Sequence, residues 1–410
     1  MSDYSNLPQE LLVEIFLRLP IKDLVKSTAV CKSWNSVIKN PNFISTHLGK
    51  AISSPDSHLL LFRLCTWEKP YYSVSVEHYS LRFDNEDVNE YKQLHFPSNF
   101  PRSVSTCFRV VGICNGLVCL VDDVVIHVDD VSSCDRDYNY ILWNPFIKKA
   151  IRLPEPSLRF RIYYGMAFTG FGFDSKTKDY KLLRFFEMDD KSIEVELYSL
   201  NANRWTSITS IAPNYSPLYR AQYYYGNSFV NGAIHLLACD RNERDRSRNI
   251  VLLAFDVSEE VFSEIPLPDH FSNASILRVQ LLKYRQSSIA TMTWECERKR
   301  RSQIHWERRS QIHLWVMKEY GVATSWTKVL TSTEAGESVA RVLFFRQDEQ
   351  VFVRMQGGWI ASLDIKTKHS KGFGVHSVPS LEEYLVVDSY VESLVLLDKC
   401  CNISPWDVIN

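Results

Sequence analysis

The feature that most constrains the fold is a phrase that recurs through most of the chain. It consists of an apolar strand, a polar turn and a second strand, often followed by proline. Six copies align, at "HYSLRFDNEDVNEYKQLHFP", "ILWNPFIKKAIRLPEP", "VELYSLNANRWTSITSIAP", "LLAFDVSEEVFSEIPLP", "LWVMKEYGVATSWTKVLTS" and "ASLDIKTKHSKGFGVHS". With Tyr79, Trp143, Tyr198, Phe255, Trp315 and Leu363 as anchors, the copies follow one another at intervals of 64, 55, 57, 60 and 48 residues. Such self-similarity indicates repeated supersecondary units.

Each phrase follows another strand pair, such as "VVGICNGLVCLVDD" or "FTGFGFDSKTKDYKLLRFF", so one unit holds about four strands. Four strands per unit, at a period near the roughly 50 residues of kelch-type blades, predict a β-propeller. The last segment, "YLVVDSYVESLVLL" at 384–397, is a strand pair without a phrase and could close the ring against the first unit. We therefore predict a large all-β domain, a kelch-like β-propeller of about six blades. Two packed sheets are the alternative.

The first 48 residues have the period of helices instead. Leu11, Leu12, Ile15, Phe16 and Leu19 form a wide apolar stripe. We expect Pro20 to close the first helix, Asn40-Pro41 to close the last, and two short helices between them. The predicted domains are a small all-α module at 1–48 and the β-domain at 49–410. A module of about 45 residues cannot bury enough surface to be stable alone, so its stripe needs a cover.

Composition excludes several classes of protein. The chain has 47 basic and 48 acidic side chains, so no net field attracts nucleic acid or anionic lipid. The segment "ERKRRSQIHWERRSQIHLW" repeats RRSQIH and is basic, which suggests either a lengthened hairpin or a local nucleic-acid or nuclear-localisation patch. No run of about 18 apolar residues and no leader segment is present, so we expect no membrane partner and a cytoplasmic or nuclear location. The 10 cysteines form no CxxC motif and are expected to be reduced and mostly buried.

No enzyme motif is found: HExxH, GxxxxGK[ST] and GxSxG are all missing. We therefore expect no catalytic residue, no metal ligand and no cofactor. A propeller enzyme, such as a hydrolase or lyase, remains an alternative, because residues from distant blades could meet at the centre. A glycan or small molecule could also bind the aromatic runs Tyr223–Tyr225 and Ile162–Gly165, although aromatic strand packing explains them more simply.

The N-terminal module resembles a known family. "LPQELLVEIFLRLPIKDLVKSTAVCKSWNSVIKNPNFISTHL" is similar to the F-box through Leu7-Pro8, Leu11 to Ile15, Leu19-Pro20, Val30 to Trp34 and Pro41 to Phe43. Phe16 stands where leucine is commoner. The rest resembles the plant F-box-associated, kelch-like domain in "GICNGLVCL", "LWNPFIKKAIRLP", "GFGFDSKTKDYKLLR" and "VELYSLNANRWTSI". Pollen S-locus F-box proteins share this layout.

The resemblance implies a non-catalytic substrate-recognition subunit of a Skp-cullin-F-box ubiquitin ligase. The helices would bind the Skp adaptor, and through it a cullin-RING ligase, while the β-domain would hold an unknown target protein. Carried over from the family, the adaptor-binding residues are Leu7, Pro8, Leu11, Ile15, Leu19, Pro20, Leu24 and Trp34. Several of these could instead form the core of the module itself.

Overall fold

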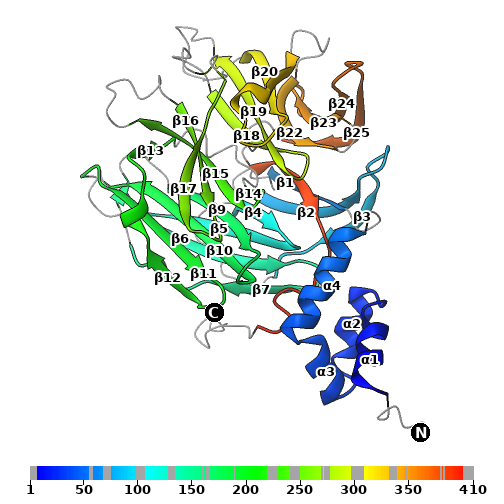
Figure 1. Ribbon diagram of the computed structural model, residues 1–410. Coiled ribbons are helices and arrows are strands. Elements are labelled where there is room, and N and C mark those ends of the chain that lie inside the picture. The colour runs from blue at the N-terminus through cyan, green and yellow to red at the C-terminus, as the bar shows by residue number, and fades with distance from the viewer. Residues whose placement is uncertain are drawn as a thin grey trace.

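In the computed structural model, a group of helices lies at one end of a ring of sheets (Figure 1). The structure describes residues 7–54, 59–67, 75–97, 107–127, 134–158, 161–162, 167–188, 190–218, 229–240, 250–268, 271, 278–296, 309–331, 339–346, 349–378, 381 and 384–399. Within these residues, no helix is both long and apolar enough to cross a membrane.

Four helices occupy the described N-terminal part: α1 (Gln9–Phe16), α2 (Ile21–Ser27), α3 (Lys32–Ile38) and α4 (Pro41–Ser53). The expectation that Asn40-Pro41 closes the last helix is wrong. Asn40 begins α4, because its side-chain oxygen accepts a hydrogen bond from the Asn42 amide at 2.9 Å, and proline suits the first helical turn. The expectation that Pro20 closes the first helix is also wrong. Helix α1 ends at Phe16, four residues earlier, and Pro20 directly precedes α2. The predicted division after residue 48 falls within α4, and the domain boundary stays a prediction.

The described strands form six sheets, which we number as blades 1 to 6 in chain order. From the centre outward, blade 1 contains β26 (Val386–Tyr390), β1 (Leu59–Trp67), β2 (Ser75–Phe83) and β3 (Glu90–Leu94). Blade 2 contains β4 (Arg109–Cys114), β5 (Leu117–His127), β6 (Cys134–Asn144) and β7 (Lys149–Arg152), with β8 (Arg161–Ile162) paired to β6. Blade 3 contains β9 (Phe168–Asp174), β10 (Asp179–Glu187), β11 (Ile193–Ser199) and β12 (Arg204–Ser207).

The remaining three blades have the same order. Blade 4 contains β13 (Tyr215–Pro217) and β14 (Phe229–Val230), both paired to β15 (Ala233–Asp240), then β16 (Ile250–Asp256) and β17 (Val261–Ile265). Blade 5 contains β18 (Arg278–Tyr284), β19 (Ser288–Cys296), β20 (Arg309–Met317) and β21 (Trp326–Thr331). Blade 6 contains β22 (Val339–Phe345), β23 (Gln350–Met355), β24 (Trp359–Asp364) and β25 (Ser370–His376). Short 3-10 helices η3 (Thr209–Ile211) and η5 (Ala323–Ser325) follow β12 and precede β21.

The ring closes as predicted, because β26 from the end of the chain pairs antiparallel with β1, with Leu59 opposite Tyr390. Neighbouring blades contact one another around the ring through strands near its centre, and β26 touches both β22 and β4. Only part of the predicted closing pair is a strand. Residues 391–397 leave the sheet and form a turn, which we call the C-terminal turn. The six-bladed propeller is confirmed.

The aligned anchor residues occupy equivalent places in the six blades. All lie on the third strand from the centre, in β2, β6, β11, β16, β20 and β24. Five of them, Tyr79, Trp143, Tyr198, Phe255 and Leu363, are buried, where they help to fill the space between neighbouring sheets. The repeat that is visible in the sequence is therefore a repeat of packing.

Candidate functional site

Helix α1 divides its apolar residues between two sides. Leu12 and Phe16 are buried, and the Phe16 ring packs edge-on against Trp34, with ring centres 5.1 Å apart, and against Phe43 at 6.4 Å. This cluster joins α1, α3 and α4. It is the small core that holds the helical module together.

The other side of α1 is not covered by the described part of the chain. Leu7, Leu11 and Ile15 are 42, 48 and 46% exposed, and they recur every four residues. We call these three residues the α1 surface. Pro8 beside them is exposed as well. Large apolar side chains left open in a row indicate a contact surface for another molecule.

The other predicted site residues are placed differently. Leu19 is half-buried and Pro20 is exposed, both in the link between α1 and α2. Leu24 is fully buried, so it belongs to the module's own core and offers no surface to a partner. Trp34 is half-buried against Phe16. For the others, adaptor binding stays a prediction.

Val30 was not among the predicted site residues, although the structure leaves it open. Its side chain is 63% exposed at the turn before α3, which makes it the most exposed large apolar residue described. The feature that could have indicated this exposure is the next residue, Cys31. Its sulfur accepts a hydrogen bond from the Trp34 amide at 3.5 Å, so α3 begins after Val30. A residue that precedes a helix start lies outside the helical stripe and can point to solvent.

The inner side of the module is covered by the propeller. Ile44 and Leu48 on α4 are buried in the same apolar cluster as Tyr180 and the C-terminal turn residues 394–396. Figure 1 shows α4 between the other helices and the blades, with the red end of the chain beside it. The propeller thus covers the apolar residues of α4. It does not cover the α1 surface, which stays open.

The C-terminal turn is fixed by one buried amide. Asn144, at the end of β6, donates hydrogen bonds from Nδ2 to the carbonyl oxygens of Ser393 and Val395, both at 2.9 Å. Its Oδ1 accepts from the Phe146 amide at 3.1 Å, so the side chain also shapes its own turn. The helices therefore rest on a support that blade 2 holds in place.

A groove of about 660 Å³ separates the helical module from blade 1. It is lined by His47 on α4 and by Phe83, Tyr91 and Glu392 from the propeller side. Burial, followed by the charge of Lys50, lowers the pKa of His47 and favours its neutral form. Burial raises the pKa of Glu392 to about 7, although Tyr91 and Lys92 oppose this change.

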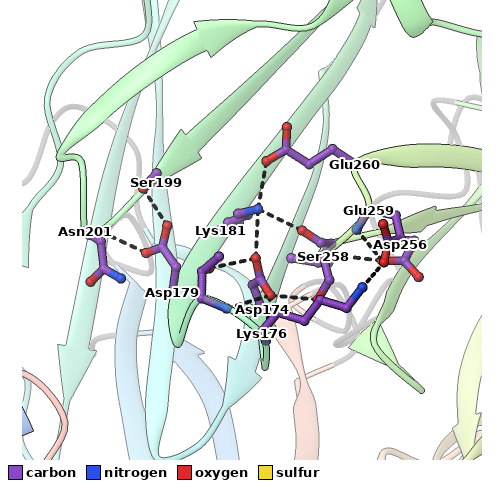
Figure 2. A network of polar contacts seen from close by, with 12 residues as sticks. Asp174, Lys176, Asp179, Lys181, Ser199, Asn201, Asp256, Ser258, Glu259 and Glu260 are labelled. Atoms are coloured by element: carbon purple, nitrogen blue, oxygen red, sulfur yellow. Dashed lines mark hydrogen bonds and ion pairs between the residues drawn. The ribbon is translucent and has the colours of Figure 1, made fainter.

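A network of polar contacts joins blade 3 to blade 4 at the same end of the propeller (Figure 2). The Lys181 ammonium donates to the Val257 carbonyl at 2.9 Å and to Glu260 at 2.7 Å, and it lies 3.1 Å from Asp174. Asp174 also accepts from the Ser258 hydroxyl at 2.7 Å. The two buried charges, Asp174 and Lys181, both have partners, so the network stabilises the blade contact.

The two faces of the propeller differ in the connections they carry. The turns after the first and third strands of each blade are mostly short, such as 115–116, 175–178 and 257–260, and they lie on the side of the helices. Lys178 and Asn201 line a pocket there together with α4. The end of β1 at Trp67 and the start of β4 at Arg109 lie at the opposite face. We call this opposite face the loop face.

Some predicted features lie outside the described residues. They are the run Tyr223–Tyr225, most of Ile162–Gly165, and the first RRSQIH copy. The second copy lies partly in β20, where His313 is opposite Thr293 on β19, so this part belongs to a hairpin. Of the six cysteines whose side chains the structure describes, four are buried, and none of the six forms a disulfide.

Comparison with known proteins decides the family. Residues 64–397 match the F-box associated beta propeller domain, and residues 4–46 match the F-box domain. The chain belongs to the F-box associated beta propeller family. The F-box is the helical module described above, and the two matches together cover both parts of the predicted layout.

Several plant F-box proteins are similar along most of their length. F-box/kelch-repeat protein At3g23880 of Arabidopsis thaliana is 28% identical, over 80% of this chain and 79% of its own. F-box protein CPR1 of the same plant is 24% identical, over 94% of this chain and 89% of its own. Among solved structures, TolB from Acinetobacter baumannii is similar with a TM-score of 0.43 and 8% identity, over 85% of this chain and 72% of its own.

Proposed function

We propose that this F-box protein is the substrate-recognition subunit of a Skp-cullin-F-box ubiquitin ligase. The F-box would bind the Skp adaptor, the propeller would hold a target protein, and other subunits would transfer ubiquitin. In this mechanism the chain acts by proximity, because it places the target beside the transfer machinery. The combination of an F-box with a propeller supports the general role of a substrate adaptor.

One observation carries the proposal: the chain covers α4 with its own propeller and leaves the α1 surface open. Leu7, Leu11 and Ile15 remain about half exposed, although their neighbours Leu12 and Phe16 are packed inside. Covering the exposed part of each side chain would gain roughly 1 kcal/mol from apolar area alone. Val30 and Pro8 could extend the contact.

The test is the double variant Leu11→Asp with Ile15→Asp. Two carboxylates in a desolvated contact strongly disfavour association, because each would need to be buried without a partner. We expect loss of Skp adaptor co-purification, with an unchanged circular dichroism spectrum and thermal transition of the propeller. Both residues are exposed, so the fold should tolerate the change.

The control is Val261→Asp, which places one carboxylate on β17, the outer strand of blade 4, at a residue with 49% exposure. This variant should retain the adaptor. If the α1 double variant binds the adaptor as the wild type does, the α1 surface is not the contact and the proposal is wrong.

We further propose that the target binds at the loop face. Because the F-box rests on the side with the short turns, the opposite face stays open when the adaptor is bound. Binding residues commonly lie on connections that a rigid scaffold positions. Trp359 at the start of β24 is 55% exposed there, and its ring packs edge-on against His376 with ring centres 5.0 Å apart.

A further inference from the structure

Two cysteines meet at the loop face where blades 1 and 2 join. The Sγ atoms of Cys65, on β1, and Cys107, just before β4, lie 2.6 Å apart, although 42 residues separate them in sequence. They are only 3 and 5% exposed. Together with Leu381, which precedes β26, they form a small apolar cluster of their own. The pair thus lies beside the strand that closes the ring.

A buried ion pair lies next to the thiols. Arg63, two residues before Cys65 on β1, places its guanidinium 2.9 Å from Glu77 and donates to the Tyr384 carbonyl oxygen at 2.6 Å. It also donates to the Phe108 carbonyl oxygen. Arg63 is fully buried, so these partners are needed to offset its desolvation. The same partners fix β1 against the residues that follow Cys107.

A metal ion does not explain the cluster, although Cys65, Glu77 and Cys107 lie within 4.8 Å of one another. Two sulfurs bound to one tetrahedral zinc at about 2.3 Å would lie about 3.8 Å apart, much farther than the pair observed here. Glu77 is already bound to Arg63, whose positive charge would repel a cation. Two sulfur atoms this close to each other are arranged for a different reaction.

We propose that Cys65 and Cys107 are a redox-sensitive dithiol that forms a disulfide across the join between blades 1 and 2. A low-molecular-weight disulfide is the oxidant. The sulfur of one cysteine attacks it, releases one small thiol and forms a mixed disulfide, which the second cysteine then resolves. In total two S–H bonds and one S–S bond break, one protein S–S bond forms, and both protons leave on two small thiols.

The reaction would fasten blade 1 to blade 2, beside the strand that closes the ring. A covalent link between β1 and the residue that leads into β4 removes loop entropy from the unfolded chain, and so raises the thermal stability. The hydrogen bond with Cys107, followed by burial, raises the pKa of Cys65, so the thiol stays protonated at neutral pH. Exchange should therefore be slow, with equilibration over hours rather than seconds.

The test uses the full-length protein, equilibrated with oxidised glutathione at pH 8, then unfolded, alkylated with N-ethylmaleimide and mapped by mass spectrometry. We expect a peptide pair linked through Cys65 and Cys107 that disappears after reduction. We also expect a rise of several degrees in the melting temperature. Cys65→Ser should abolish both effects, whereas Cys119→Ser, which alters another buried cysteine, should leave the link in place. The mapping of the wild type needs no variant, so it remains decisive if Cys65→Ser does not fold.

Two results would overturn the proposal. One is that both cysteines are fully alkylated, or carry glutathione separately, after the equilibration. A reference dithiol that becomes oxidised in the same buffer shows that the conditions were oxidising enough. The other is one equivalent of zinc in the purified wild-type protein that is lost in Cys65→Ser, because the cluster would then be a metal site.

Discussion

At the scale of single residues, the repeats depend on a few turn positions. Asx residues end several strands and accept hydrogen bonds from the amides that follow, as Asp174, Asp256 and Asp364 do. Other turns use Asn-Gly pairs. Gly116 and Gly232 have nearly the same backbone, with φ of 79° and 78°, but only Gly116 is pressed against the C-terminal turn. Both Asn-Gly pairs make a tight turn, and the one at Gly116 also lets the C-terminal turn pack closely.

This difference can be measured by comparing Gly116→Ala with Gly232→Ala. Each variant should lose about 1 kcal/mol of unfolding free energy, because alanine disfavours the left-handed backbone conformation at these positions. A methyl group at Gly116 would also lie 2.5 Å from the Val391 carbonyl oxygen, whereas at Gly232 it meets nothing within 4 Å. Overpacking should cost Gly116→Ala about 1 to 3 kcal/mol more in the free energy of urea unfolding. Equal losses would mean that the C-terminal turn does not pack on this hairpin.

At the scale of elements, neighbouring blades are joined by polar as well as apolar contacts. The Asp174 turn between β9 and β10 is bonded to the turn between β16 and β17 through Lys181 and Ser258. Burial alone would raise the pKa of Asp174, but hydrogen bonds from Ser258, Thr177 and Lys181 outweigh it and lower the pKa. The charged carboxylate is therefore favoured by the folded state.

The sign of the pH dependence follows from that lowered pKa. Asp174 stabilises the fold fully above the unfolded value of about 3.9, and this contribution is lost as pH falls through the lower folded value. Asp174→Asn should cost about 3 kcal/mol in unfolding free energy, constant from pH 5 to 7, and the gap to wild type should narrow below about pH 4.

Asp364→Asn is the control for this experiment, because Asp364 caps a similar turn but makes its described hydrogen bonds within that turn. Its loss should be smaller. A gap between Asp174→Asn and wild type that widens in acid would contradict the assignment of the charged carboxylate as the stabilising form.

At the scale of the whole molecule, the two faces of the ring differ in what lies beside them. The F-box and the C-terminal turn lie beside each other on one side (Figure 1), which is also the side of the short turns, and strand ends such as that of β1 lie on the other side. The α1 surface and the loop face are therefore at opposite sides of the propeller. An adaptor on the first would not block a protein on the second.

We expect a photo-cross-linking amino acid at Trp359 to capture target proteins, and one at Val261 not to. The two positions have similar exposure but lie at opposite ends of their blades, on the loop face and on the side of the F-box. The experiment is made in the Leu11→Asp, Ile15→Asp background with the proteasome blocked, so that bound targets are not degraded. Capture at Val261 but not at Trp359 would place the target on the side of the F-box and contradict binding at the loop face.

The sequence alone predicted the architecture and most of the strands because each of these signals is local. An apolar stripe, an Asx or Asn-Gly turn and a regular spacing of anchors depend on residues close together in the chain, and repetition made them clear. The exposed side of α1 was partly predictable for the same reason. Helical spacing says that Leu11 and Leu12 point to different sides, but it does not say which side the chain itself covers.

Only the tertiary structure decided the contacts between distant segments. It placed Leu24 inside the module, laid the C-terminal turn under α4, and brought Cys65 next to Cys107. Asn40-Pro41 could have ended a helix or begun one, and the burial of Phe43, Ile44 and Leu48 made it a beginning. The physical reason is common to all of these cases: periodicity determines which side chains share a face, while burial depends on what folds against that face.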